Sequence, residues 1–99
     1  MYAEVTSVQL RRGHTERGLE LWRDAIAPFF KRHAGFRELL VVGDRGTDRG
    51  MAIVLWESRE AFQAAADDPE HRAVFGRMAP WLAAPTQRET FEVLLQERS

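Results

Sequence analysis

The run from Met51 to Trp56 is apolar at every position and is followed by Glu57 and Ser58. Successive side chains of a strand point to opposite faces, so a strand here presents apolar side chains on both faces. The rest of this 99-residue chain predicts helices for only one face of a sheet. We therefore expect a second copy of the chain to cover the other face, which predicts an obligate homodimer.

Alternating and helical patterns predict the elements in the first third of the chain. Residues 3–10 alternate imperfectly between apolar and polar side chains and predict a first strand. Thr15 is the expected N-cap of a first helix, with Glu16 in its first turn and Gly35 at its C-terminal end. The apolar stripe of this helix has helical spacing and consists of Leu19, Trp22, Ile26, Phe29 and Phe30. Pro28 removes a backbone donor inside the helix, which predicts a kink or an interruption there.

The remaining elements follow from the same kinds of pattern. Residues 36–43 and 51–57 predict two strands, joined by a polar, glycine-rich hairpin loop. Ser58 is expected to cap a short helix, which restarts at Asp68, a cap followed by proline. The apolar positions that continue this second helix are Val74, Phe75, Met78 and Leu82. Residues 90–95 predict the last strand.

The resulting order of elements is β-α-β-β-α-β, in a single domain that spans residues 1–99. This order is typical of the split βαβ, or ferredoxin-like, arrangement. It is an α+β fold in which a four-stranded antiparallel sheet carries both helices on one face. Two such subunits packed sheet to sheet form a dimeric α+β barrel, which agrees with the apolar second face of the third strand.

Composition excludes several classes of protein. The net charge of −1 lacks the basic excess that nucleic-acid binding requires. The absence of cysteine excludes disulfides and thiolate metal sites, and no other residues have metal-ligand spacing. The N-terminus does not resemble a signal peptide, and no apolar run approaches the ~20 residues of a membrane span. We expect a cytoplasmic protein that binds neither nucleic acid nor membrane.

Three segments carry a resemblance to a known family, namely Val8–Gly13, Val54–Phe62 and Asp68–Phe75. Over nearly its whole length the chain resembles the antibiotic biosynthesis monooxygenase (ABM) domain, a branch of the dimeric α+β-barrel superfamily. The resemblance implies an oxygenase without cofactors, in which dioxygen alone oxidises a quinol, an anthrone or a related polycyclic aromatic. The substrate would supply the electrons itself, as a stabilised carbanion or phenolate.

Another branch of the superfamily degrades haem. Resemblance to that branch would imply an Asn on the first strand and a Trp and a His on the second helix. Aligned on the turn before the first helix and on the start of the second, these positions fall on Thr6, Ala65 and Phe75. None of the three required residues is present, so the resemblance disfavours haem degradation.

An oxygenase of this kind needs an apolar slot, a base and donors for an oxyanion. His71 is the candidate base, because imidazole titrates near neutral pH; its simpler interpretation is a helix-start histidine bonded to a nearby polar group. Glu4 and Thr6 are candidate polar contacts, because the resemblance turns their strand face toward the helices. Burial would raise the pKa of Glu4, whereas the simpler interpretation is a frayed strand with Glu4 in solvent.

The candidate substrate-binding residues are Tyr2, Trp56, Phe75, Met78 and Trp81. Aromatic and methionine side chains at such spacing also occur as plain core, and Trp22 is assigned to the core. His14 and His33 flank the first helix and are expected at the surface.

Two functional hypotheses follow. The first is a homodimeric, cofactor-independent monooxygenase that acts on a quinol-like or polycyclic aromatic substrate in a cavity between sheet and helices. The second is a non-catalytic dimeric barrel that binds a small hydrophobic ligand. A polar-lined pocket that contains His71 would favour catalysis, and a filled core would favour the second hypothesis.

Overall fold

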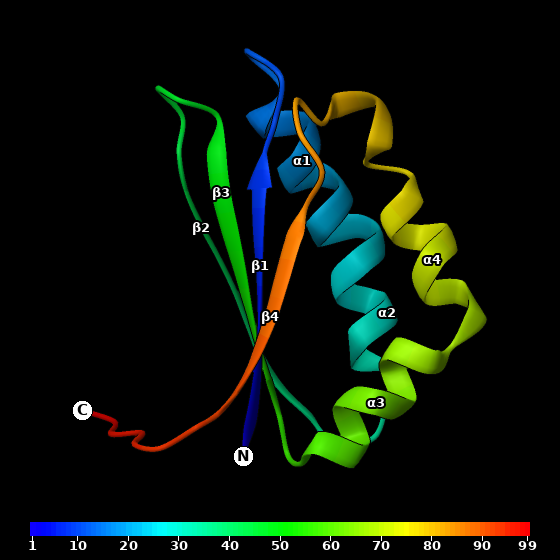
Figure 1. Cartoon of the computed structure of the whole chain (residues 1–99), viewed down its shortest axis with the longest axis vertical. Coiled ribbons are helices and arrows are strands. Elements are labelled where there is room, and N and C mark those ends of the chain that lie inside the picture. The colour runs from blue at the N-terminus through cyan, green and yellow to red at the C-terminus, as the bar shows by residue number, and fades with distance from the viewer.

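The computed structural model describes residues 1–99 as a four-stranded antiparallel sheet with helices on one of its faces (Figure 1). The strands are β1 (Tyr2–Gln9), β2 (Phe36–Asp44), β3 (Arg49–Trp56) and β4 (Gln87–Glu92). The helices are α1 (Thr15–Leu21), the π-helical η1 (Trp22–Ile26), α2 (Ala27–Lys31), α3 (Arg59–Asp67), α4 (Pro69–Gly76) and the 3-10 helix η2 (Ala79–Trp81). The predicted α+β, ferredoxin-like fold is confirmed.

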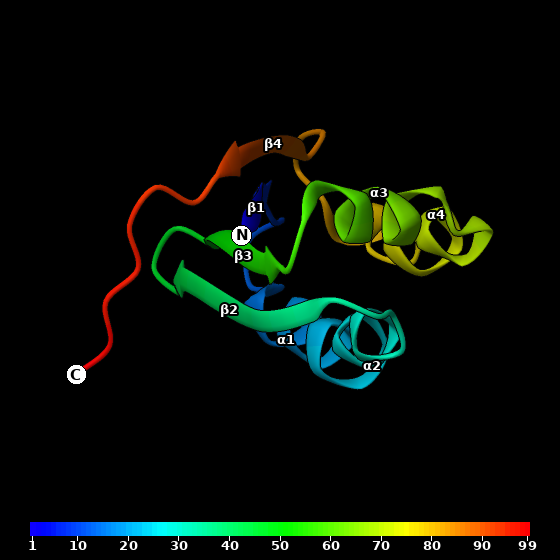
Figure 2. The same cartoon turned by 90° about the horizontal axis from the view of Figure 1, so that it is seen from below.

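The strand order places the two helical segments over different halves of the sheet. The strands lie in the order β2-β3-β1-β4, so β3 and β1 are the inner strands. Figure 2 shows α1 and α2 on the β2 side of the sheet and α3 and α4 on the β4 side. The space between sheet and helices is therefore bordered by α1 and α2 on the β2 side and by α3 and α4 on the β4 side.

The helix-covered face of β1 carries polar as well as apolar side chains. Glu4, Thr6 and Val8 alternate along it and are all buried. The expectation of a frayed strand with Glu4 in solvent is wrong, because only 2% of Glu4 is exposed. Since β1 pairs with both β3 and β4 along residues 2–7, its start is held from two sides.

The first helix begins differently from the prediction. His14 occupies the N-cap position and makes no side-chain capping bond, and Thr15 is the first helical residue. The hydroxyl of Thr15 donates a hydrogen bond of 2.6 Å to Oδ1 of Asp48, in the loop between β2 and β3. The prediction of Thr15 as N-cap is wrong, because Thr15 lies inside the helix and its hydroxyl is hydrogen-bonded to the Asp48 carboxylate instead of to the helix backbone.

Pro28 interrupts the α-helical pattern without ending the helix. It lies in the first turn of α2, where a missing N–H costs least. The five residues before α2 form a π-helix, η1, which replaces the α-helical bonding pattern ahead of the proline. The predicted interruption therefore takes the form of a change in helix type.

Gly35 allows the chain after α2 to pass close to α3. Its φ of +87° lies in the left-handed region that favours glycine. A Cβ atom on Gly35 would lie 2.5 Å from the Cβ of Ala61, and the Gly35 carbonyl accepts a 2.7 Å hydrogen bond from the N–H of Glu57. The prediction of Gly35 as the C-cap of the first helix is wrong, because the helix ends at Lys31 with Arg32 as its C-cap and Gly35 lies in the turn before β2.

The caps of the second helical segment are confirmed, whereas the last strand is displaced from its prediction. Ser58 accepts a hydrogen bond from the Ala61 N–H, and Asp68 accepts one from the Glu70 N–H. The strand β4 spans Gln87–Glu92, so the prediction of residues 90–95 is wrong at both ends. Its register sets Glu92 against Tyr2, the first residue of β1.

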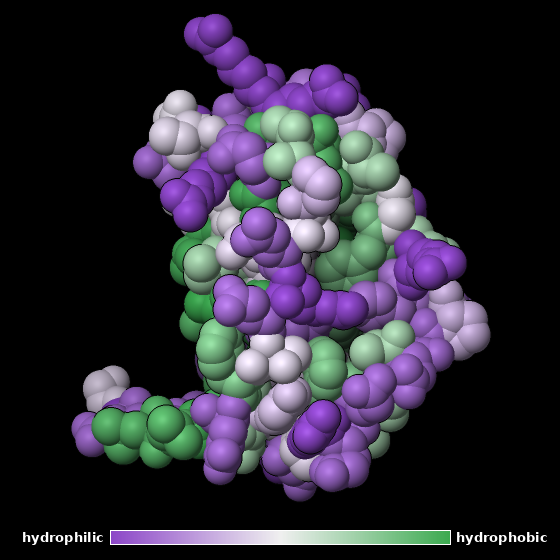
Figure 3. All heavy atoms as spheres, in the orientation of Figure 1, coloured by the Kyte–Doolittle hydropathy of each residue, from purple (hydrophilic) through white to green (hydrophobic).

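The second face of the sheet is uncovered in the single chain. Leu40, Val42 and Phe91 are each about half exposed, and Leu94 and Leu95 are largely exposed. Figure 3 shows hydrophobic side chains along the edge of the molecule opposite the helices and in the C-terminal segment that extends from it. None of the helices is long and apolar enough to cross a lipid bilayer.

Candidate functional site

A buried carboxylate and an arginine form an ion pair on the helix-covered face of the sheet. Nη1 of Arg88 donates a hydrogen bond of 3.1 Å to Oε2 of Glu4. The pairing of β1 with β4 sets Arg88 opposite Thr6, so its side chain starts on the face that carries Glu4. The side chain of Arg88 is 42% exposed and that of Glu4 only 3%. The pair therefore connects the interior with the surface.

The same arginine nitrogen also reaches His71 on α4. Nη1 of Arg88 lies 3.1 Å from Nε2 of His71, and because arginine stays protonated, Nε2 of the neutral imidazole accepts this bond. The imidazole stacks on Phe75 at 4.6 Å and meets the ring of Phe29 at 5.9 Å. We call Glu4, Arg88 and His71 the polar cluster; it joins β1, β4 and α4.

The polar cluster shifts the pKa values of both of its titratable members. Burial raises the pKa of Glu4, and the hydrogen bond and charge of Arg88 oppose this effect. Burial also lowers the pKa of His71, the positive charge of Arg88 lowers it further, and Asp68 opposes both. The lowered pKa of His71 favours the neutral imidazole, which is the form that accepts a proton.

The other predicted site residues surround the cluster to different degrees. Trp56 is fully buried and packs against Phe30, and its indole N–H is directed toward Glu4 without making a hydrogen bond. Tyr2 donates a hydrogen bond of 2.9 Å from its hydroxyl to Thr90 Oγ1. The structure thus gathers Glu4, Thr6, His71, Trp56 and Phe75 between the sheet and the second helical segment. Trp81 is half-buried in η2, and Met78 lies in the core.

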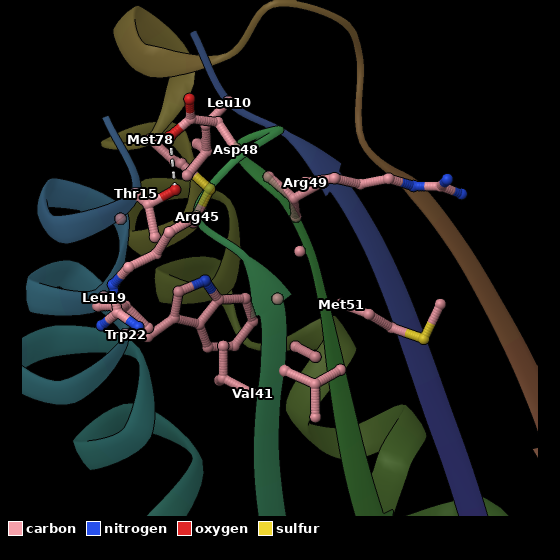
Figure 4. Close-up of a pocket in the computed structure, with 16 residues that line it drawn as sticks. Leu10, Thr15, Leu19, Trp22, Val41, Arg45, Asp48, Arg49, Met51 and Met78 are labelled. Atoms are coloured by element: carbon pink, nitrogen blue, oxygen red, sulfur yellow. Dashed lines mark hydrogen bonds between the residues drawn. The ribbon is translucent and has the colours of Figure 1, made fainter. Parts of the chain in front are cut away.

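A separate cavity of about 230 Å³ lies at the other end of the helix-covered face (Figure 4). It is bordered by α1, by the β2–β3 hairpin, and by Val8, Leu10 and Met78. Of the predicted site residues, Met78 is the one that lines it. Trp22, which the sequence assigned to the core, forms one of its walls.

Glycines and a buried aspartate shape this cavity. Gly43 and Gly50 face each other across β2 and β3, so this part of the wall carries no side chains. The carboxylate of Asp48 accepts hydrogen bonds from the Thr15 hydroxyl (2.6 Å) and the Gly13 N–H (2.9 Å). These bonds, with that of Thr15 the strongest, lower the pKa of Asp48. They hold the hairpin loop against the start of α1.

Sequence reasoning missed both Arg88 and Asp48. Arg88 lay outside the predicted last strand, although the alternation of Arg88, Thr90 and Glu92 around Phe91 is the signal that places it on a strand face. No local signal distinguishes Asp48 from Asp44, because both are polar residues of one glycine-rich loop.

The histidines at the ends of the first helix differ in their surroundings. Nδ1 of His33 lies 2.8 Å from the carbonyl oxygen of Phe29, and Nε2 lies 2.9 Å from Oδ2 of Asp68. The expected surface position of His33 is wrong, because only 15% of the His33 side chain is exposed. It is covered where Asp68, the N-cap of α4, packs against the end of α2. His14 is partly exposed beside Arg12. No three His, Cys, Asp or Glu side chains are gathered as metal ligands would be.

Comparison with known proteins identifies the family. The sequence matches the family model described as antibiotic biosynthesis monooxygenase over residues 1–77. This chain belongs to the ABM family. The matched ABM region runs from β1 to the end of α4 and therefore contains Glu4 and His71, whereas Arg88 lies beyond it. No curated protein matches the sequence significantly.

Solved structures share the ABM fold over almost the whole chain. A variant of SnoaB, a cofactor-independent oxygenase from Streptomyces nogalater, is 19% identical, and the match covers 96% of this chain and 94% of that one at a TM-score of 0.83. A candidate antibiotic biosynthesis monooxygenase from Nitrosomonas europaea is 20% identical, with coverages of 96% and 100% and a TM-score of 0.76. A candidate from Deinococcus radiodurans is 13% identical, with coverages of 100% and 98% and a TM-score of 0.82. At these identities the likeness shows the fold alone.

Proposed function

We propose that this ABM protein is a cofactor-independent monooxygenase for an aromatic substrate with an acidic O–H group, in the quinol-like or polycyclic phenol class. The observation that carries the proposal is the polar cluster, in which Arg88 joins buried Glu4 to neutral His71. Deprotonation of a phenol requires a base and a fixed cation at one place. The likeness to SnoaB, described as a cofactor-independent oxygenase, supports the same chemistry.

In the proposed first step, Nε2 of His71 takes the proton from the substrate O–H. Arg88 then donates a hydrogen bond to the oxyanion that forms in place of the one to Nε2, while Nη1 keeps its hydrogen bond to Glu4. The lowered pKa of His71 keeps the imidazole free to accept the proton near neutral pH. The charge of Arg88 stabilises the anion where it develops.

The deprotonated substrate then reduces dioxygen. For an anthrone, a ring CH₂ group loses four electrons and becomes a carbonyl. One atom of dioxygen enters the product, and the other leaves as water with the two hydrogens. The substrate supplies all four electrons, so the side chains have only to move the first proton, hold the oxyanion and exclude water.

The proposal places the aromatic ring between β4 and α4. Figure 3 shows a hollow with a hydrophobic floor in this region. Phe75 stacks on His71, and Phe75, Trp81 and Met78 all belong to the apolar packing on this side of the sheet. A flat ring in the hollow would therefore meet apolar side chains on its faces and the polar cluster at its O–H group.

The proposal is tested by dioxygen uptake of the purified, metal-free protein with reduced quinols and anthrones. We expect uptake above the spontaneous rate without added flavin, haem or metal. His71→Gln should lower turnover by about 100-fold or more, because it removes the general base. His14→Gln is the matched control and should leave turnover unchanged, since His14 lies near the start of the first helix and outside the polar cluster. Unchanged turnover in His71→Gln would exclude the role of His71.

One observation favours the second hypothesis, a non-catalytic protein that binds a small hydrophobic ligand. The apolar cavity of about 230 Å³ does not include His71 or Glu4 among its lining residues. A protein that only binds a ligand needs such a cavity and no base. Absence of dioxygen uptake across the whole panel, with ligand binding retained, would favour this function.

We further infer that two copies of the chain pair through the uncovered face of the sheet. The apolar side chains of that face come from β2 (Leu40, Val42), β3 (Met51, Ile53, Leu55) and, on β4, from Phe91, and the C-terminal segment with Leu94 and Leu95 extends from the same side (Figures 1 and 2). Large exposed apolar patches mark interaction surfaces. The ABM resemblance supports a sheet-to-sheet dimer. Light scattering should give the mass of a dimer at micromolar concentration, and a monomer at that concentration would refute the inference.

A further inference from the structure

We propose that the cavity between α1 and the β2–β3 hairpin is a second binding site, distinct from the polar cluster, for a small planar aromatic acid. Its volume is about 230 Å³, and a protein cavity of about 150 Å³ is large enough to hold benzene. A bicyclic ring system is therefore the size of ligand expected. The indole of Trp22 lies on one side of this space (Figure 4). The lining also includes Gly43 and Gly50, which are paired across β2 and β3 and carry no side chains. This slot fits a flat ring better than a branched aliphatic group.

The carboxylate and hydroxyl side chains on the cavity wall are already hydrogen-bonded, so most of the interior favours an apolar ligand. Both carboxylate oxygens of Asp48 accept hydrogen bonds, and the Thr15 hydroxyl is used as a donor to one of them. The remaining wall side chains include Val8, Leu10 and Met78. A polar ring substituent beside Asp48 and Thr15 would find both side chains already paired and would lose its hydration.

The mouth of the cavity, in contrast, carries a cation that an acidic ligand can use. Arg45 lines the cavity, and its Nε donates a 2.6 Å hydrogen bond to Oε1 of Glu16 on α1. Both side chains are largely exposed, so this ion pair contributes little and is easily exchanged. A carboxylate on the bound ring can replace Glu16 as the partner of Arg45 while the ring stays inside.

This site is separated from the polar cluster along the sheet. Val8, in the cavity, and Glu4, in the polar cluster, are four residues apart on β1, which corresponds to about 13 Å. Each site also has its own tryptophan, since Trp22 borders the cavity and Trp56 points its indole N–H toward Glu4. Each indole N–H group is therefore a probe placed at one of the two sites.

The proposal is tested by titrating ¹⁵N-tryptophan-labelled protein with 2-naphthoate and, as a neutral analogue, 2-naphthalenemethanol. We expect both probes to shift the Trp22 indole resonance and to leave that of Trp56 in place. Arg45→Ala should weaken 2-naphthoate about two- to fivefold, as an exposed ion pair predicts, and leave 2-naphthalenemethanol unchanged. Indole resonances are assigned with Trp22→Phe and Trp56→Phe.

A variant that fills the cavity provides the second measurement. Val41 lies at its rim on the edge strand β2 and is partly exposed, so a larger side chain is accommodated without rebuilding the core. Val41→Phe should abolish the Trp22 shift, and the matched control Val41→Thr, which keeps the volume, should retain it. Shifts confined to Trp56, no shift with either probe, or undiminished binding in Val41→Phe would each overturn the proposal. None of these outcomes depends on dioxygen uptake, so the proposed monooxygenase function stands or falls separately.

Discussion

Removal of Arg88 should destabilise the fold in proportion to the ionisation of Glu4. Loss of one partner from a buried ion pair costs about 3–5 kcal/mol, because the remaining charge is left uncompensated. Glu4 is almost completely buried, but Arg88 is 42% exposed, so solvent already screens part of the interaction. For Arg88→Ala we therefore expect a loss of about 2 kcal/mol in the free energy of unfolding when Glu4 is ionised.

The sign of the pH dependence follows from the raised pKa of Glu4. Burial raises it above the ordinary value of 4.5, and loss of Arg88 would raise it further. Below the ordinary value, Glu4 is neutral in both the folded and the unfolded protein, so Arg88 has no charge to compensate. As the pH rises through the raised pKa, the folded protein must ionise a buried group, and this cost is larger without Arg88.

Urea unfolding at pH 4 and pH 8, at one fixed protein concentration, measures the difference. Arg88→Ala should lose about 2 kcal/mol at pH 8 and less than about 0.5 kcal/mol at pH 4. In a Glu4→Gln background, the pH dependence of the same substitution should shrink to the part that comes from His71, whose pKa Arg88 also lowers. An equal loss at both pH values in the native background would refute the assignment of Arg88 as the charge partner of Glu4.

Three further outcomes test other parts of the structure. Gly35→Ala should lower the free energy of unfolding by about 2–4 kcal/mol in urea, because it combines a left-handed φ with a Cβ atom 2.5 Å from the Cβ of Ala61. Adding Ala61→Gly should recover the part of this loss that is due to the steric overlap. Thr15→Val should lower the urea midpoint at pH 7, and its effect should disappear as the pH falls through the lowered pKa of Asp48, when the carboxylate takes a proton. If His71 is the base, kcat/KM should decrease with falling pH only below 6.5, the ordinary pKa of histidine, because burial and then Arg88 lower the pKa of His71 against the opposing effect of Asp68. A decrease that begins at or above pH 6.5 would contradict this role.

The fold could be predicted because its main signals are local. The apolar run 51–56, the cap at Ser58 and the restart at Asp68 each depend on neighbouring residues, and each is found where the sequence indicated. The ends of β4 could not be predicted in the same way, because they depend on where β1 stops offering partners.

The candidate site was only half visible in the sequence for a similar reason. Glu4 and His71 stand out by residue type, but Arg88 becomes relevant only once the pairing of β1 with β4 sets its side chain on their face. The apolar cavity had no sequence signal, because its space arises where Gly43 and Gly50 meet across two strands and carry no side chains.

The aromatic packing between the two sites has a consequence for how they respond to ligands. The ring of Trp22 meets that of Phe75 edge to face at 5.6 Å, and Phe75 stacks on His71 at 4.6 Å. The cavity wall and the polar cluster are therefore in contact through a single shared ring, and a ligand that shifts Trp22 also acts on the residue against which His71 rests. Thermodynamic linkage makes any such effect reciprocal: the factor by which an aromatic acid changes the affinity for substrate equals the factor by which substrate changes the affinity for the acid. Under the proposed function, Phe75 would therefore let the protein sense the concentration of a second aromatic compound.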